Sequence, residues 1–162
     1  VLQHEIPLET VHYVIEFCYE KGIKIVLNPA PAAAVPMEII DKVTYVTPNE
    51  HEAVLIFGDK LSTEDLLRKY PEKLVITQGS RGVSTCLKDG RILNIPARKA
   101  QVVDTTGAGD TLNGAFSVQI AEGKAIEDAL TYANVAASLS TEKFGAQTGM
   151  PTAEEVETEL KK

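Results

Sequence analysis

The stretch Asp104-Thr105-Thr106-Gly107-Ala108-Gly109-Asp110-Thr111 sets a run of small residues between two carboxylates. A helical pattern follows, from about Asp110 to Ala121, and Gly123 marks where that helix should end. Small residues let the main chain approach a ligand closely, and the N–H groups of a helix start attract negative charge. The stretch therefore predicts an anion hole suited to a phosphoryl group, with Asp110 placed to accept a proton from an attacking hydroxyl. A simpler alternative is that Asp110 caps the helix and the glycines only form a turn.

Ahead of this stretch, short apolar runs alternate with helical patterns. Strands are expected at 24–28, 43–46 and 73–77, and helices at 11–18, 50–57 and from residue 62. An Asp-Gly turn predicts a hairpin of residues 83–87 and 91–95, and further helices are expected at about 125–141 and after Pro151. This order predicts a Rossmann-like α/β fold of three layers, with a mostly parallel sheet, helices on both of its faces and one hairpin.

Polar or glycine-rich segments follow the predicted strands, and ligands of parallel α/β sheets bind at the carboxyl ends of strands. Asn49 and Glu52 share one face of a helix start and could hold hydrated Mg²⁺ and a phosphate oxygen. The alternative is a solvated helix start capped by Asn49. Gly79-Ser80-Arg81-Gly82 could wrap nucleotide phosphates with Arg81 as counter-charge, or could be only a tight turn.

Composition narrows the classes of partner. The chain has 162 residues and a net charge of −7, which argues against nucleic acid and anionic membranes as partners. No apolar run approaches the length of a membrane span. Cys18 and Cys86 are expected to be reduced thiols and no signal-peptide pattern is visible, so a cytoplasmic location is expected. Leu112 stands where a dinucleotide fingerprint needs glycine, and the three histidines are too scattered to predict a metal site.

These segments, taken in order, resemble the C-terminal half of the ribokinase family of ATP-dependent sugar kinases. Residues 104–116 are similar to that family's second signature, and Thr47-Pro48-Asn49-Glu50-His51-Glu52 is similar to its Asn-x-x-Glu motif. Leu27-Asn28-Pro29-Ala30-Pro31-Ala32 and Gly145-Ala146-Gln147 resemble the ribokinase branch more than the fructokinase or adenosine kinase branches. The resemblance runs from Val1 to about Pro151.

The resemblance implies a role for each matched segment. Asp110 would be the catalytic base and contact the substrate, and the anion hole would comprise Gly107, Ala108 and Gly109. The contacts with ATP would come from Asn49, Thr77, Gln78, Gly79, Ser80, Arg81, Gly82 and Asn134. Glu5 would contact the sugar, and Glu52 would serve Mg²⁺. A site for K⁺ or another monovalent cation would comprise Asp104, Thr106, Ser140, Lys143, Gly145 and Gly149.

The resemblance implies transfer of the ATP γ-phosphate to a sugar hydroxyl, with ribose the favoured sugar. Residues 1–162 would then be a single nucleotide-binding and catalytic half-domain, without the N-terminal sugar-binding half and the lid. A sheet cut in this way would expose a strand edge, so we expect self-association or pairing with an N-terminal half. Two alternatives remain at this stage: a nucleotide-binding or interaction module without kinase activity, and an unrelated α/β enzyme.

Overall fold

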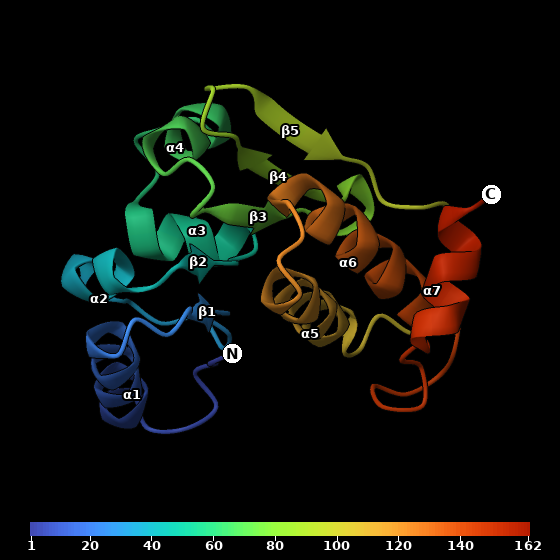
Figure 1. Cartoon of the computed structure of the whole chain (residues 1–162), viewed down its shortest axis with the longest axis horizontal. Coiled ribbons are helices and arrows are strands. Elements are labelled where there is room, and N and C mark those ends of the chain that lie inside the picture. The colour runs from blue at the N-terminus through green and yellow to red at the C-terminus, as the bar shows by residue number, and fades with distance from the viewer. The chain divides into compact units, whose positions relative to one another are not determined.

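The computed structural model describes residues 1–162 and has an α/β architecture (Figure 1). Its helices are α1 (Leu8–Glu20), α2 (Met37–Lys42), α3 (Glu50–Phe57), α4 (Thr63–Lys69), α5 (Ala108–Ala121), α6 (Ile126–Ser140) and α7 (Ala153–Leu160). Its strands are β1 (Val26–Leu27), β2 (Tyr45–Val46), β3 (Val75–Thr77), β4 (Val83–Cys86) and β5 (Ile92–Ile95), and the 3₁₀ helix η1 is Gly79–Arg81. No helix combines the length and the apolar character that crossing a membrane requires.

The chain forms two compact units, which we describe separately. The first unit is Val1–Gln78 with Ser84–Leu93, and the second unit is Gly79–Val83 with Asn94–Lys162. Two compact units can belong to one domain or to two, so they do not decide between these arrangements. The single domain expected from the sequence therefore stays a prediction.

Parallel pairing runs through the strands of the first unit. β1 and β2 are parallel partners, with Val26 opposite Tyr45. Single parallel bridges extend this pairing on both sides, and they are Leu2–Leu27, Val46–Leu74 and Asn49–Thr77. β3, β4 and β5 follow in the order β3-β4-β5, and the Leu87 N–H donates to the Arg91 carbonyl across the turn between β4 and β5 at 2.9 Å. A mostly parallel α/β arrangement with one hairpin is therefore confirmed.

The core of the first unit is built from the apolar runs that predicted the strands. Ile25, Val26 and Leu27 are all buried, as expected of a strand covered on both faces. Val11 and Ile15 of α1 are fully buried and contribute to the same apolar cluster. The helix α2 was not expected from the sequence; its Ile39 and Ile40 join this cluster.

The end of α3 and the start of α4 follow the local sequence signals closely. α3 ends at Gly58, whose φ of +81° is in the left-handed region that glycine adopts readily. The Ser62 hydroxyl caps α4 by accepting a hydrogen bond from the Asp65 N–H at 3.1 Å. These ends agree with the predicted start and stop residues.

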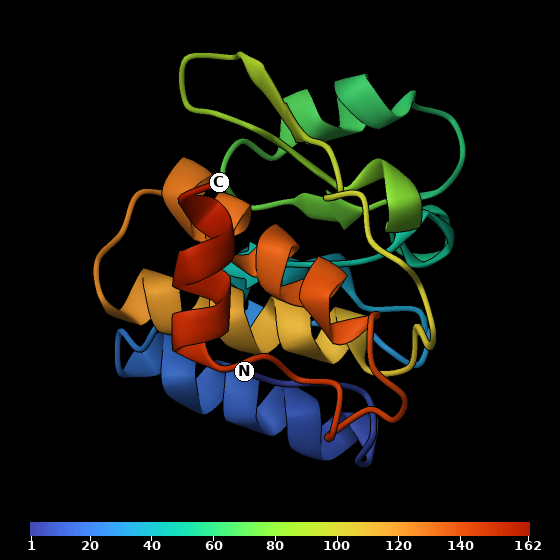
Figure 2. The same cartoon turned by 90° about the vertical axis from the view of Figure 1, so that its right-hand side faces the viewer.

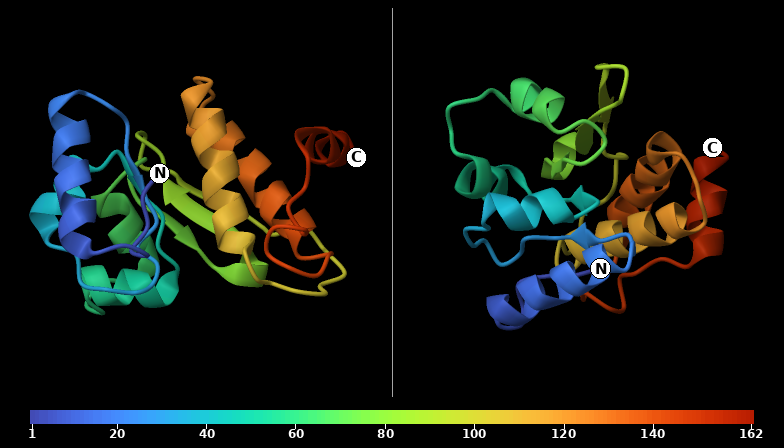
Figure 3. Two further views of the ribbon diagram at one scale, coloured as in Figure 1. Left: turned by 90° about the horizontal axis from the view of Figure 1, so that it is seen from below. Right: turned by 60° about the vertical axis from the view of Figure 1, so that its left-hand side comes forward.

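The second unit is formed mainly by three helices. α5 and α6 lie side by side (Figure 3), and α7 packs against α6 (Figure 2). Phe116 of α5 is fully buried, as are Ala129 and Ala133 of α6. The small alanine side chains allow neighbouring helices to approach closely, as the sequence suggested.

Candidate functional site

The loop that precedes α5 has a different helix start from the one expected. Gly107, with φ of +80°, is the N-cap of α5, and the helix begins at Ala108 rather than near Asp110. The Gly107 carbonyl accepts hydrogen bonds from the Thr111 N–H at 2.8 Å and from the Thr111 hydroxyl at 2.9 Å. Asp110 therefore lies in the first turn, so the alternative that Asp110 caps the helix is wrong. The sequence could not show this, because a glycine cap has no side chain to mark it.

Gly107 and Gly109 meet different surroundings. A Cβ added to Gly107 would stand 3.0 Å from the Cα and Cβ of Ala146, in addition to the unfavourable φ. A Cβ added to Gly109 would meet no atom within 4 Å, and its φ is not in the left-handed region. Backbone conformation and the close approach of Ala146 thus explain why residue 107 is glycine. Neither reason applies to residue 109. Open space beside Gly109 leaves the main chain of the helix start accessible, where helix N–H groups point outward.

The Asp110 side chain is exposed at this helix start. Its position in the first turn places a carboxylate close to the positive end of the helix dipole. An exposed carboxylate beside outward-pointing N–H groups can contact a bound molecule directly. The arrangement therefore suits both parts of the predicted chemistry, proton acceptance and anion binding.

Asp104 connects the loop that precedes α5 to the segment that follows α6. Its Oδ1 accepts a hydrogen bond from the Thr106 N–H at 2.9 Å, and its Oδ2 accepts one from the Gly145 N–H at 3.0 Å. Hydrogen bonds from the Thr106 side chain, the Thr106 main chain and Gly145 hold the pKa of this carboxyl below its ordinary value of 3.8. The carboxylate is thus kept ionised and fixed between two loops.

Main-chain oxygens converge around Gly149. A Cβ added to this glycine would stand 2.7 Å from the Ser140 carbonyl oxygen, 2.8 Å from that of Gly145 and 3.5 Å from that of Lys143. The φ of Gly149 is not in the left-handed region, so close approach rather than backbone conformation favours glycine here. We call these three carbonyls the carbonyl cradle. Ser140, Lys143, Gly145 and Gly149 all belong to the predicted cation set, and that set stays a prediction.

In the first unit, Asn49 and Glu52 form a complete capping box at the start of α3. Asn49 Oδ1 accepts from the Glu52 N–H at 2.9 Å, and Glu52 Oε2 accepts from the Asn49 N–H at 2.8 Å. Glu52 is buried, with 7% of its surface exposed. The capping role that the sequence left open for Asn49 is therefore real, although capping does not by itself exclude ligand binding.

Thr77 and Gln78 lie beside this capping box. Thr77 forms a parallel bridge with Asn49, and its N–H donates to the Pro48 carbonyl at 3.0 Å. Gln78 Oε1 accepts a hydrogen bond from the Ser84 hydroxyl at 2.6 Å. The first unit thus brings together three of the predicted ATP- or Mg²⁺-contacting residues, which are Asn49, Glu52 and Thr77, and Gln78 follows Thr77 in the chain.

In the second unit, Gly82 and Asn134 lie against the same main-chain segment. A Cβ on Gly82, whose φ is +92°, would clash with the Ile95 carbonyl oxygen. The Asn134 side-chain amide donates to the Pro96 carbonyl at 2.7 Å. Gly79–Arg81 form η1, a single 3₁₀ turn closed by the hydrogen bond from the Gly82 N–H to the Gly79 carbonyl at 2.9 Å, which agrees with the tight-turn alternative. The side chains of Ser80 and Arg81 are exposed there.

Two buried polar residues, His4 and Asn28, lie near the ends of the parallel strands, and sequence reasoning missed His4. His4 Nε2 and Asn28 Oδ1 are buried without a hydrogen-bond partner, while His4 Nδ1 lies 3.2 Å from the Pro31 carbonyl oxygen. Burial lowers the pKa of His4 below its ordinary value of 6.5. Glu5, the predicted sugar contact, is exposed next to His4. Nothing in the sequence around His4 signals its burial, whereas Asn28 is the last residue of the strand predicted at 24–28.

The sequence and the fold agree on the class of protein. The model of the pfkB family of carbohydrate kinases matches residues 1–153, and the chain belongs to this family. It is 53% identical over 157 residues to the ribokinase of Bacillus subtilis, covering 97% of this chain and 53% of that protein. It is 51% identical to the ribokinase of Lactococcus lactis, covering 99% of this chain and 53% of the relative.

Solved structures give the same result. The ribokinase of Arabidopsis thaliana, complexed with ribose and ATP, matches with a TM-score of 0.89 at 30% identity, over 99% of this chain and 55% of that one. The ribokinase of Thermotoga maritima matches with a TM-score of 0.86 at 36% identity, over 99% and 55% respectively. The chain therefore spans about half the length of the relatives it matches.

Proposed function

We propose that this chain supplies the ATP site, the anion hole and the catalytic base of an ATP-dependent sugar kinase, with ribose as the sugar. The observation that carries the proposal is the start of α5, where the exposed Asp110 lies in the first turn beyond the glycine N-cap. The relatives named ribokinase, and the Arabidopsis structure with ribose and ATP, support both substrates. The contacts that Asn134, Glu5 and residues 77–82 make with ATP or sugar belong to this proposal.

The reaction follows from the chemistry at the start of α5. Asp110 accepts the proton of a sugar hydroxyl, and the resulting oxygen forms a bond to the γ-phosphorus of ATP. The bond from that phosphorus to the bridging oxygen breaks, and ADP leaves with the electron pair. The predicted anion hole of Gly107, Ala108 and Gly109 would stabilise the negative charge on the transferring phosphoryl group. In the structure the Ala108 N–H donates to the Thr105 carbonyl at 3.2 Å, so this bond would open when the phosphoryl group binds. The protein thus contributes positioning and charge stabilisation.

Mg²⁺ fits the capping box at the start of α3 as an ion held mainly by phosphates and water. No group of three or more His, Cys, Asp or Glu residues in the structure is arranged to hold a metal ion. Mg²⁺ prefers few protein ligands and keeps several waters, so Glu52 and Asn49 are sufficient partners for it. When bound, the ion would neutralise phosphate charge during transfer.

A monovalent cation fits the carbonyl cradle. Neutral carbonyl oxygens suit K⁺ or a similar ion, and the carbonyls of Ser140, Lys143 and Gly145 already converge there. Asp104, ionised and bonded to Gly145, adds negative charge to the same loop. Such an ion would add fixed positive charge near the loop that precedes α5.

A second candidate function is a nucleotide-binding module that does not catalyse transfer. The observation in its favour is that Asn49, Glu52 and Thr77, which are predicted to contact ATP or Mg²⁺, lie together in the first unit through bonds that do not involve Asp110. We also propose that the active form is a homo-oligomer or pairs with an N-terminal half. Both cysteines are free thiols, which supports a cytoplasmic setting for either function.

Two measurements separate these candidates. Calorimetric titration with ATP and Mg²⁺ measures binding to the chain, and a coupled assay of ADP release with ribose measures turnover. The turnover assay is repeated with the N-terminal half of the Bacillus subtilis ribokinase added. Ribose-dependent ADP release in either arrangement supports the kinase. ATP binding without turnover in both arrangements favours the module, and no ATP binding overturns both.

A further inference from the structure

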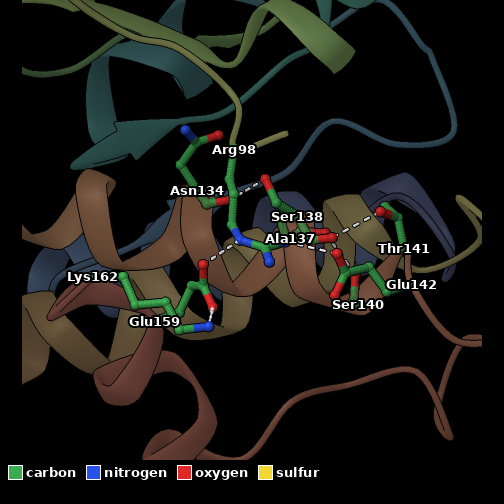
Figure 4. Close-up of polar contacts among 9 residues, drawn as sticks. All are labelled: Arg98, Asn134, Ala137, Ser138, Ser140, Thr141, Glu142, Glu159 and Lys162. Atoms are coloured by element: carbon green, nitrogen blue, oxygen red, sulfur yellow. Dashed lines mark hydrogen bonds and ion pairs between the residues drawn. The ribbon is translucent and has the colours of Figure 1, made fainter. Parts of the chain in front are cut away.

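Arg98 joins three separate parts of the second unit through one guanidinium group. Its Nε donates to Glu159 Oε1 of α7 at 2.6 Å, and its Nη1 donates to Glu142 Oε1, just after α6, at 2.7 Å (Figure 4). Lys162 donates to the other oxygen of Glu159 at 2.7 Å. The side chains of Arg98 and Glu159 are 25% and 16% exposed, so this contact is partly shielded from solvent. No sequence signal singled out these residues.

A second ion pair connects the loop that follows α6 to α7. Lys143 Nζ lies 3.1 Å from Glu155 Oε1. The other oxygen of Glu155 accepts from the Thr152 N–H at 2.7 Å, which completes the capping box of α7. Glu155 therefore fixes the start of α7 and holds Lys143 at the same time.

The residues held in this way belong to the carbonyl cradle or adjoin it. Lys143 contributes one of the three carbonyls near Gly149, and Glu142 is its chain neighbour. The Ser140 carbonyl comes from the last residue of α6. Asp104 restrains this loop by accepting the hydrogen bond from the Gly145 N–H, and the ion pairs that restrain it come from Arg98 and α7.

We propose that Arg98 is a positioning residue that, together with α7, fixes the carbonyl cradle and so sets its affinity for a monovalent cation. This inference rests on the cation site of the proposed function. Arg98 touches no reacting atom; it acts through Glu142 and the loop that follows. Because coupling between two binding events is reciprocal, a cation in the cradle also strengthens the docking of α7.

The test measures cation binding by thermal stability rather than by activity. The melting temperature is followed as KCl replaces choline chloride at constant ionic strength, and the rise gives an apparent Kd for K⁺. Arg98→Ala is expected to raise this Kd about fivefold. Residues that hold the ligands of a metal ion in place affect the affinity for that ion, and partly exposed ion pairs make only a modest contribution. The affinity for ATP with Mg²⁺ at saturating K⁺ should not change.

Two further variants address the case in which Arg98→Ala does not fold. Arg98→Lys keeps the positive charge, but a lysine ammonium lacks the planar set of donors with which the guanidinium bonds Glu142 and Glu159 together. Glu155→Gln keeps the α7 capping box while removing the charge that holds Lys143. Both should weaken K⁺ binding. The matched control is Arg68→Ala, which removes the exposed Arg68–Glu64 pair on α4 and should leave the Kd for K⁺ unchanged.

Hydrogen exchange provides the reciprocal measurement. KCl should slow the exchange of the α7 amides in the unmodified chain, and Arg98→Ala should remove that effect. A K⁺ response in Arg98→Ala, Arg98→Lys and Glu155→Gln equal to that of the unmodified chain would overturn the inference. An unmodified chain that does not respond to K⁺ would overturn it too, while ATP binding and turnover would still stand as the separate test of the kinase.

Discussion

The Asp104 carboxylate bonds the main chain of Gly145, a residue 41 positions later, through a hydrogen bond of 3.0 Å from the Gly145 N–H to Oδ2. Its other oxygen accepts from the Thr106 N–H at 2.9 Å. Asp104→Asn should lower the melting temperature, because an amide NH₂ group would then face one of these two N–H donors.

The pH dependence gives a second readout for Asp104. Its pKa is lowered below 3.8 in the folded state by the Thr106 and Gly145 hydrogen bonds, so its stabilising effect is complete above pH 3.8. The effect is lost as the pH falls from that value through the lowered pKa. The difference in melting temperature between the unmodified chain and Asp104→Asn should therefore shrink in acid. A difference that stayed constant down to the lowest pH would contradict this account.

Asp110→Asn tests the catalytic base. Turnover should fall by about 10²- to 10⁴-fold, the usual contribution of a general base, while the Kd for ATP stays unchanged. The assay is the ribose-dependent ADP release described above, in whichever arrangement is active. Asp128, an exposed aspartate in the first turn of α6, offers a matched control. Asp128→Asn should keep full turnover, and normal turnover in Asp110→Asn would remove the base from the mechanism.

The two glycines at the start of α5 should respond in opposite ways to alanine. Gly107→Ala should destabilise the fold by about 1–2 kcal/mol, because its φ of +80° is unfavourable for alanine and Ala146 stands close by. Gly109→Ala should keep or slightly raise stability, since nothing crowds that position. It should nevertheless lower turnover, because a methyl group would occupy the space beside the proposed anion hole. Denaturant unfolding and the ADP assay, run on both variants, distinguish the two effects.

Glu52 combines two roles that substitution can separate. Glu52→Gln keeps an oxygen that can accept the Asn49 N–H, so the melting temperature should change little. The gain in ATP affinity that Mg²⁺ produces should fall about tenfold, because the carboxylate charge is gone. Glu52→Ala should also lose about 1 kcal/mol of stability with the capping bond. Titrations of ATP with and without Mg²⁺ measure the effect, and an unchanged Mg²⁺ dependence in Glu52→Gln would argue against a metal role.

His4 should make stability depend on pH near neutrality. Its pKa is lowered by burial and by nearby His12, against the raising effects of the Pro31 hydrogen bond and Glu52, so the unfolded chain binds the proton more readily. Stability should therefore be complete above about pH 6.5 and decline as the pH falls below that value. His4→Leu should flatten this decline, whereas His51→Gln, at an exposed position on α3, should not. Melting temperatures measured between about pH 5 and 8 test the prediction.

The sequence predicted the elements whose ends carry side-chain signals. The bounds of α3 follow from Asn49 and Gly58, and the start of α7 follows from Thr152. The sequence does not predict α2, because this helix has only six residues and its N-cap, Pro36, makes no side-chain hydrogen bond. The start of α5 was placed too late for a related reason, since Gly107 caps it through backbone conformation alone.

The candidate site shows a similar division. Local motifs predict Asp104, Asp110 and Glu52 as site residues, because their spacing from glycines or from Asn49 is visible in the sequence. The contacts of Arg98 could not be predicted, since its partner Glu159 lies 61 positions away and no pattern connects the two. The convergence of three carbonyls at Gly149 likewise depends on the backbone path of the loop that follows α6. The identities of the side chains in that loop do not predict this path.

The pairing of Asn49 with Thr77 runs through main-chain atoms. Bonds of this kind do not depend on which side chain stands at either position. Under the proposed function, replacing Thr77 or Gln78 would therefore alter the contacts with ATP without displacing the helix start that carries Glu52. Recognition and structural support would then be carried by different atoms of the same residues, so nucleotide preference could diverge, in evolution or by design, while the backbone stays in place.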